Sequence, residues 1–237
     1  MSADAAIDAP LQLSWVLPLH RTAAPLEELV ARIHGVATDL GLRHEVILVD
    51  DACPEHSGVL AQRMAVRDPR LRVLRLERHQ GQDRALIAGL RLSRGEWTVV
   101  HDADLQDPPE AVARMWPLCT AAHDAVFARR TGRYSSRGRQ ATSRLYRALA
   151  SRIGGLPDGA GLYVALHRGA LDRINAAARG NATLLALVAG TRPRCASIDI
   201  VRARRAAGTS SYGTLARARK AARSLWELLA MRIAPLP

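Results

Sequence analysis

Short apolar runs alternate with amphipathic stretches through the first half of the chain, and this alternation is the strongest constraint on the fold. The runs that resemble strands cover residues 11–17, 45–49, 71–76 and 97–100. Stretches with apolar residues at helical spacing cover residues 25–40, 59–66 and 85–92. Regular alternation of this kind predicts an α/β fold with a mostly parallel central sheet and helices on both faces.

The second half of the chain is less regular but contains the same kinds of segment. Pro109 favours a helix over residues 109–122, because proline fits the first turn of a helix. Further strands are predicted at 125–128, 162–166 and 198–201, and further helices at 145–153 and 170–177. Hydrophobic residues make up 48% of the 237 residues, which is enough for one substantial core in a single domain.

Polar residues follow each predicted strand of the first half. They are His20-Arg21, Asp50-Asp51, His79-Gln80 and Asp102-Ala103-Asp104. In open parallel sheets, ligands bind beyond the carboxyl ends of the strands. We therefore expect a binding site where these four groups meet.

Asp102 and Asp104 are the most informative pair among these groups. If the backbone stays extended, side chains two residues apart point the same way, and both carboxylates can share one cation. Oxygen ligands of this kind favour Mg²⁺ or Mn²⁺, and such an ion can bridge a diphosphate. The alternative is a solvated turn whose aspartates cap the following helix.

The net charge narrows the classes of partner. Lys+Arg 34 and Asp+Glu 22 give +12, and Lys220 is the only lysine. Arginine grips phosphate through paired hydrogen bonds, so nucleotides, anionic lipids and nucleic acids are candidate partners. Aromatic residues are only 4% of the chain, with Phe127 the single phenylalanine, which argues against nucleic-acid binding. Cys53, Cys119 and Cys195 lie far apart and are interpreted as reduced thiols.

The string Asp-Ala-Asp-Leu-Gln-Asp-Pro-Pro-Glu at 102–110 resembles the metal-binding motif of family-two glycosyltransferases. It is most similar to the branch of dolichol- and polyprenyl-phosphate mannosyl- and glucosyltransferases. Supporting resemblances lie at 16–20, 46–51 and 205–212, and at Gly81, Ala85 and Gly89. The resemblance covers residues 13–212 and implies one GT-A nucleotide-binding domain at 1–212.

The resemblance also implies roles for individual residues. Pro18, Asp50 and Asp51 are expected to hold the nucleoside base and ribose, and Gln106 to lie near the sugar or phosphates. Asp102 would hold Mg²⁺ or Mn²⁺ and the nucleotide-sugar. Asp104 would be the second metal ligand and a catalytic residue. The other expected catalytic residues are Arg130 and Arg205, which would bind phosphate, and Asp158, which would face the acceptor. Arg133 is expected to bind the phosphates of the nucleotide-sugar.

The implied reaction is the inverting transfer of a hexose from a nucleotide-sugar of the GDP-mannose or UDP-glucose type to a polyprenyl or dolichyl phosphate. One alternative is a related transferase with a soluble acceptor. A more distant alternative is a non-catalytic protein that binds nucleic acid or other anions. His20 and His79 differ from the usual family pattern, which has tyrosine and asparagine at these places.

Residues 213–237 form a basic segment after the expected domain. A helix over 215–233 would gather its apolar residues on one side and separate them from the basic ones. These apolar residues are Leu215, Ala218, Ala222, Leu225, Trp226 and Leu229. Such a helix can lie in a membrane interface, or it can pack on the domain or on a second subunit of a homo-oligomer. Since the sequence has no long apolar run and no leader pattern, we expect a cytoplasmic protein, peripheral on the inner face of the membrane.

Overall fold

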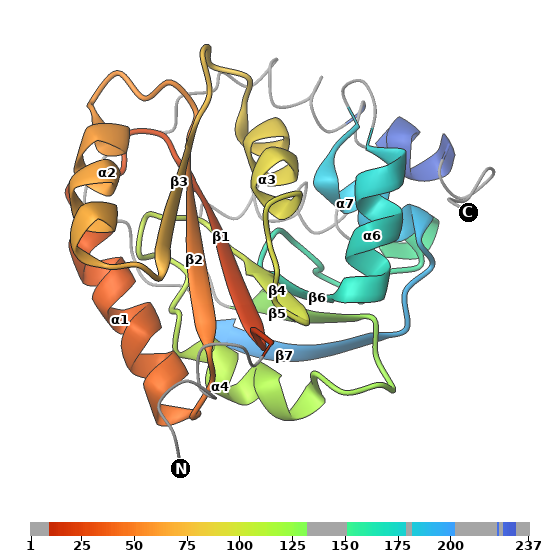
Figure 1. The fold of residues 1–237 in the computed structure, drawn as a ribbon. Coiled ribbons are helices and arrows are strands. Elements are labelled where there is room, and N and C mark those ends of the chain that lie inside the picture. The colour runs from red at the N-terminus through yellow and green to blue at the C-terminus, as the bar shows by residue number, and fades with distance from the viewer. Residues whose placement is uncertain (1–9, 132–150, 179–181, 202–221, 223–224, 231–237) are drawn as a thin grey trace.

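A seven-stranded sheet forms the centre of the protein in the computed structural model, which describes residues 10–131, 151–178, 182–201, 222 and 225–230 (Figure 1). The strand order is β3-β2-β1-β4-β6-β5-β7. The strands are β1 (Leu13–Leu19), β2 (His44–Asp50), β3 (Leu71–Arg75), β4 (Trp97–Val100), β5 (Ala125–Thr131), β6 (Val164–His167) and β7 (Cys195–Val201). Each of the seven strands predicted from the sequence is present, with ends shifted by a few residues.

The sheet is mostly parallel, as predicted. β1 runs parallel to β2 and β4, β2 runs parallel to β3, and β5 runs parallel to β7. The exception is β6, which is antiparallel to both of its neighbours, β4 and β5. The carboxyl ends of the other six strands therefore lie at one edge of the sheet.

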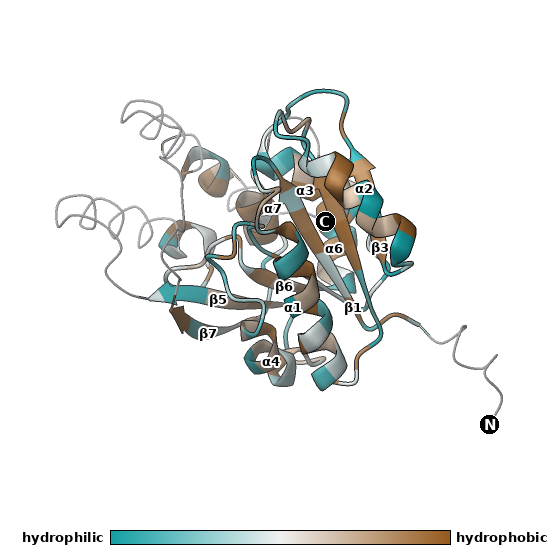
Figure 2. Cartoon of the chain, turned by 90° about the vertical axis from the view of Figure 1, so that its left-hand side faces the viewer, coloured by the Kyte–Doolittle hydropathy of each residue, from teal (hydrophilic) through white to brown (hydrophobic). Residues whose placement is uncertain are grey.

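Helices cover both faces of the sheet (Figure 1). The helices α1 (Leu26–Asp39), α2 (Ser57–Arg67) and α4 (Ala111–Met115) contribute to one hydrophobic cluster. The helices α3 (Gln82–Leu90), α6 (Arg168–Ala177) and α7 (Leu184–Gly190) contribute to the cluster on the other face. The central strands between the two clusters are largely hydrophobic (Figure 2). The two-faced arrangement predicted from the sequence is confirmed.

Gly89 explains why α3 can lie so close to the sheet. A Cβ atom at this position would approach Val16 Cγ1 to 2.5 Å and Val49 Cγ2 to 2.7 Å. Both distances are shorter than real carbon contacts, so only glycine lets the helix axis sit this near to β1 and β2. This close packing fixes the amino-terminal turn of α3 beside the carboxyl edge of the sheet.

Two helices differ from the prediction. The helix expected over 109–122 ends at Met115 and continues only as the 3₁₀ turn Trp116–Leu118. Pro117 has no backbone N–H and cannot continue the α-helical hydrogen bonds. Helix α7 was not predicted, because its sequence Leu-Leu-Ala-Leu-Val-Ala-Gly has no polar face and so shows no helical period.

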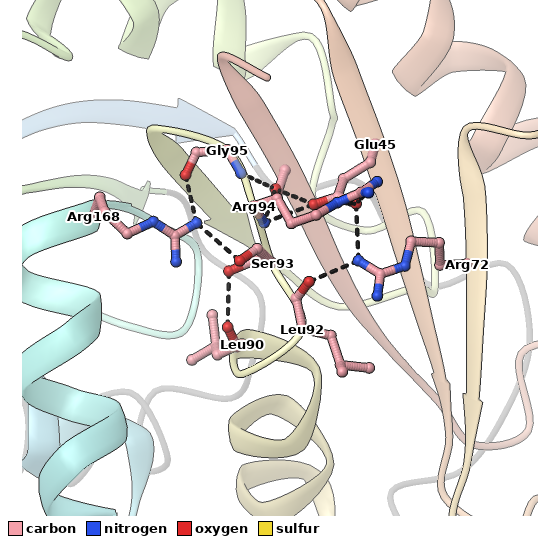
Figure 3. A network of polar contacts seen from close by, with 9 residues as sticks. Glu45, Arg72, Leu90, Leu92, Ser93, Arg94, Gly95 and Arg168 are labelled. Atoms are coloured by element: carbon pink, nitrogen blue, oxygen red, sulfur yellow. Dashed lines mark hydrogen bonds and ion pairs between the residues drawn. The ribbon is translucent and has the colours of Figure 1, made fainter. Parts of the chain in front are cut away.

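A buried carboxylate joins three strands at the amino end of the sheet (Figure 3). Glu45 of β2 accepts hydrogen bonds from Ser14 Oγ of β1 at 2.8 Å and from Arg72 Nη1 of β3 at 3.1 Å. Arg94, in the turn before β4, donates its backbone N–H and two guanidinium N–H groups to the same carboxylate. The side chain of Glu45 is only 2% exposed, so this network compensates for a buried charge.

The described part of the C-terminal segment is helical at 225–230. Leu228 is fully buried in the hydrophobic cluster to which α3, α6 and α7 contribute, and Glu227 accepts a hydrogen bond from the Thr183 N–H at 2.9 Å. The predicted apolar side included Trp226 and Leu229, but these side chains are 71% and 38% exposed. Most of the predicted helices at 145–153 and 215–233 lies outside the described residues, as does the boundary at 212.

Candidate active site

Asp50, at the carboxyl end of β2, closes the turn that leads into α2. Its carboxylate accepts a hydrogen bond from the Cys53 N–H at 2.9 Å and pairs with Arg75 Nε at 3.3 Å. Gly58 packs directly on it, since a Cβ atom there would fall 1.9 Å from Asp50 Oδ2. The carboxylate is buried, so its described contacts are internal to the protein.

Asp51 holds the loop between β3 and α3. One carboxylate oxygen accepts the Gln80 N–H at 2.7 Å, and the other accepts the Gly81 N–H at 2.8 Å. His79 Nδ1 lies 2.8 Å from the same Asp51 Oδ2. The Asp51 side chain is 2% exposed, so three donors from one loop surround a buried charge. The expectation that Asp51 contacts the nucleoside stays a prediction.

Asp102 and Asp104 lie in the turn that follows β4. Because β4 ends at Val100, both aspartates lie beyond the strand, and the extended-backbone argument for their common direction does not apply. Asp104 Oδ1 accepts the Gln106 N–H at 3.1 Å. Leu105, which lies between Asp104 and Gln106, has a φ of 58°, and this left-handed conformation tightens the turn. Both aspartates and Gln106 are partly exposed at the carboxyl edge.

Two side chains from other elements hold Asp102. Gln82, the first residue of α3, donates its side-chain amide to Asp102 Oδ1. Arg130 of β5 donates Nη2 to Asp102 Oδ2 at 3.0 Å. One carboxylate thus connects α3 and β5 at the end of β4, and the close packing at Gly89 sets the position of Gln82.

Arg130 is itself fixed by a carboxylate that sequence reasoning missed. Its Nε donates to Asp107 Oδ1 at 3.0 Å, and its Nη2 reaches the second oxygen of Asp107. Burial disfavours the guanidinium charge, but Asp107 and Asp102 together raise the pKa of Arg130. The Asp107 side chain is 0% exposed. The only sequence signal for Asp107 was its place in the 102–110 string.

Two buried, uncharged side chains bind the backbone of the turn that follows β4. His101 Nδ1 bonds the Asp102 carbonyl at 2.8 Å, and Tyr163 donates its hydroxyl to the Pro108 carbonyl at 2.9 Å. Their rings lie 5.0 Å apart. Burial lowers the pKa of His101 and raises that of Tyr163, which favours the uncharged form of both. His101 and Tyr163 therefore bind the backbone near both ends of the turn, and neither side chain adds a charge next to the aspartates.

The other expected site residues are more scattered. Pro18 lies in β1 opposite Val49 of β2. Asp158 is exposed in a turn next to β5, where a Cβ atom on Gly159 would lie 4.0 Å from Arg129 Cβ. Arg133 and Arg205, which the sequence predicted to bind phosphate, lie outside the described residues.

The donor set suits a hard divalent cation. Asp102 and Asp104 supply carboxylate oxygens on a partly exposed turn, which is the chemistry that Mg²⁺ and Mn²⁺ prefer. Within the described residues, no group of three His, Cys, Asp or Glu side chains could hold a metal ion. A cation at this turn would complete its coordination with water and ligand oxygens, so the residues fit a metal that binds together with a diphosphate.

This fold and site define a glycosyltransferase of the GT-A type. The sequence matches the family described as Glycosyl transferase family 2 over residues 14–174. The chain therefore belongs to glycosyl transferase family 2, as its 102–110 string indicated. The GT-A fold and the enzyme class predicted from the sequence are both confirmed.

Curated relatives include the undecaprenyl-phosphate 4-deoxy-4-formamido-L-arabinose transferases. The chain is 32% identical over 210 residues to that of Pseudomonas aeruginosa, which covers 87% of this chain and 62% of the relative. The Shewanella sediminis transferase is 28% identical over 204 residues, covering 85% of this chain and 62% of the relative. The chain thus spans less than two thirds of the length of these relatives.

Solved structures share the fold at low sequence identity. Glucosyl-3-phosphoglycerate synthase from Mycobacterium tuberculosis, in complex with Mn²⁺, UDP and phosphoglyceric acid, matches with a TM-score of 0.69 and 19% identity. That match covers 97% of this chain and 81% of the other. The mannosyltransferase PcManGT from Pyrobaculum calidifontis, in complex with GDP-Man and Mn²⁺, matches with a TM-score of 0.62 and 20% identity. It covers 97% of this chain and 67% of the other.

Proposed function

We propose that this chain transfers a glycosyl group from a nucleotide-sugar to a polyprenyl phosphate. The observation that carries the proposal is the turn after β4, where Gln82 and Arg130 hold Asp102 beside Asp104. Family membership and the names of the curated relatives support the reaction and the acceptor class. The chain spans 62% of the P. aeruginosa relative, so the activity of the whole protein is part of the proposal.

The chemistry of the acceptor explains why the site needs few catalytic groups. A phosphate monoester is already ionised near neutral pH, so its oxygen can attack without a general base. The site has to align this oxygen behind the anomeric carbon and stabilise the departing diphosphate. A single displacement of this kind inverts the anomeric configuration. A product with retained configuration would refute this mechanism.

Asp102 and Asp104 would hold the divalent cation, Mg²⁺ or Mn²⁺, that neutralises charge on the departing nucleoside diphosphate. Arg130 adds a fixed positive charge next to Asp102. Because Asp107 binds it from the buried side, the guanidinium keeps its position without needing the substrate. The structures of PcManGT and of the M. tuberculosis synthase, which share this fold, both contain Mn²⁺, and this supports the proposal of a divalent cation here.

The proposal also concerns which sugar the donor nucleotide carries. The sequence resemblance favours a hexose carried by GDP or UDP. The curated relatives are named for 4-deoxy-4-formamido-L-arabinose, which is a pentose derivative. Both donor classes therefore belong in the same assay.

A soluble phosphorylated acceptor is the second candidate. It is favoured by the likeness to the M. tuberculosis synthase, whose structure contains phosphoglyceric acid. That likeness is one of fold alone, whereas the undecaprenyl-phosphate relative from P. aeruginosa shares 32% of its residues with this chain over the matched length. We therefore place the lipid phosphate first.

One assay separates the candidates. The protein is incubated with GDP- and UDP-sugars, Mn²⁺ or Mg²⁺, and either a polyprenyl phosphate or 3-phosphoglycerate. We expect a lipid-linked sugar in the presence of metal and none after chelation with EDTA. Transfer only to 3-phosphoglycerate would favour the soluble acceptor, and no transfer from any donor would refute the enzymatic proposal.

A peripheral contact with the membrane on the cytoplasmic side completes the proposal. No helix in the described part of the chain is both long and apolar enough to span a bilayer. Trp226 and Leu229 expose apolar surface on the helical segment 225–230, and tryptophan favours the interface of a bilayer. Co-sedimentation with anionic vesicles tests this point, and Trp226→Ala should weaken it. Equal sedimentation of both proteins would refute a role for this side chain.

A further inference from the structure

The first turn of α3 connects the turn after β4 to the rest of the fold. Gln82, the first residue of α3, binds Asp102 through its side-chain amide. The first turn of a helix frays easily, because its N–H groups have no partners within the helix. The N-cap residue of α3 is Gly81, which has no side chain to supply a partner. The direction of the Gln82 amide therefore depends on contacts from outside the helix.

The residues on either side of Gln82 make such contacts. The Gly81 N–H donates to Asp51 Oδ2 at 2.8 Å. Asp83 Oδ1 accepts the Leu184 N–H at 3.0 Å. Asp51 follows β2, whereas Leu184 is the first residue of α7, which lies beside α3 (Figure 1). Gln82 is thus held between two contacts with different parts of the fold, and together they fix the first turn of α3.

The amino end of α7, to which Asp83 binds, is itself held firmly. Leu184 is fully buried. Thr183 caps α7 with its hydroxyl, and its own N–H donates to Glu227 at 2.9 Å. Leu228, the neighbour of Glu227, is also fully buried, so this contact comes from a packed segment. The Asp83 carboxylate therefore binds a rigid part of the protein, which a positioning contact requires.

We propose that Asp83 is a positioning residue for the proposed metal site. Its bond to α7 keeps the Gln82 amide directed at Asp102. Gln82 and Arg130 bind different oxygens of Asp102, so the carboxylate is held from two sides before a cation arrives. A ligand that is already in position loses little freedom on binding. The inference rests on the proposed function, since it concerns an aspartate that would hold the cation.

Binding of UDP and GDP in the presence of Mn²⁺ tests the inference without turnover. We expect Asp83→Ala to bind the preferred nucleotide about fivefold more weakly than the unmodified protein, or about 1 kcal/mol. Asp83→Asn keeps an oxygen for the Leu184 N–H and should retain most of the affinity. Both variants remove the same negative charge, so an effect of charge alone would weaken both equally. Asp83→Asn that binds as weakly as Asp83→Ala would therefore overturn the inference.

A double-mutant cycle with Gln82→Ala separates positioning from a general loss of structure. If Asp83 acts through Gln82, then Asp83→Ala has little further effect once the Gln82 amide is gone. Independent losses would instead add. We expect the double variant and Gln82→Ala to differ in nucleotide affinity by less than about twofold. A further fivefold loss in the double variant, about as large as that of Asp83→Ala alone, would overturn the inference.

Amide hydrogen exchange in the unmodified protein gives a test that needs no variant. A contact that supports nucleotide binding must in turn be stabilised by the nucleotide, because coupling is reciprocal. Mn²⁺ with UDP or GDP should therefore slow exchange of the Leu184 N–H by about fivefold relative to amides in the interior of α7. Unchanged exchange at Leu184 in the nucleotide complex would overturn the inference even if Asp83→Ala failed to fold.

The matched control is Asp172→Ala, which removes a carboxylate from α6 whose side chain is 62% exposed. Its nucleotide affinity should equal that of the unmodified protein, and thermal unfolding of every variant shows whether the fold is intact. Equal affinity in the unmodified protein and in Asp83→Ala would overturn the inference and leave the proposed function standing. Absence of Mn²⁺-dependent UDP and GDP binding by the unmodified protein would overturn the proposed function, and this inference with it.

Discussion

Glu45→Gln is expected to destabilise the protein by about 2–3 kcal/mol, although it changes only one atom. Oε1 faces Ser14 Oγ and the Arg94 N–H, and Oε2 faces the guanidinium groups of Arg72 and Arg94. The arginine groups can only donate, and the Ser14 hydroxyl already accepts the Arg94 and Gly95 N–H groups, so the new amide NH₂ meets occupied or donating groups on whichever side it lies. A buried donor that loses its acceptor costs about 1–3 kcal/mol. Arg94 is 61% exposed and Arg72 35% exposed, so water recovers part of this loss.

Thermal and urea unfolding of the purified protein measure the effect. For a chain of this size, each kcal/mol lowers the melting temperature by about 2–4 °C, so we expect a decrease of about 4–12 °C. The control is Glu96→Gln, whose side chain is 65% exposed and which should change stability by less than about 0.5 kcal/mol. A Glu45→Gln protein that is as stable as this control would refute the reasoning that both oxygens are needed as acceptors.

Further predictions concern the site, the packing and the response to acid. Asp104→Ala should abolish transfer while the melting temperature stays within about 2 °C, and full activity would rule out a metal role. Arg130→Lys should lower kcat/KM about tenfold or more, because lysine lacks the paired N–H groups that reach Asp107 and Asp102; unchanged kinetics would contradict this. Gly89→Val should destabilise the protein by at least about 2 kcal/mol in urea, since its side chain has no space; a stable variant would refute the packing argument. Hydrogen bonds from Arg70 and Arg194 lower the pKa of Asp68 and Asp124 to about 2, so their stabilisation is complete above their ordinary pKa of 3.8 and is lost as pH falls toward 2. Unfolding measured from pH 5 to 2 should show this loss, and a flat profile would contradict it.

The sequence predicted the fold well because its strands and helices have clear periods. The apolar residues of 25–40, for example, are those that α1 buries against the sheet. Helix α7 was missed because an entirely buried helix has no amphipathic pattern. The early end of α4 depends on Pro117, which interrupts the helix inside a segment whose other residues favour it.

The site was predictable as a set of strand ends, but its contacts were not. Asp102 and Asp104 were found from a local string, whereas the partner of Arg130 depends on where β5 lies relative to β4, with β6 between them. Asp107 is 23 residues away from Arg130 in the sequence, and no spacing rule connects them. Likewise, the burial of Asp51 is set by the fold of the β3–α3 loop, which the sequence pattern does not reveal.

The reversed strand β6 acts as a spacer that aligns the two halves of the site. Val100 of β4 pairs with Val164 of β6, which in turn pairs with Phe127 of β5. Arg130 therefore lies three residues beyond the level at which β4 ends, and two strand spacings, about 10 Å, away from it. Only a long side chain can bridge that gap. A slip of one residue between β5 and β6 would turn Arg130 toward the opposite face of the sheet and separate it from both aspartates at once.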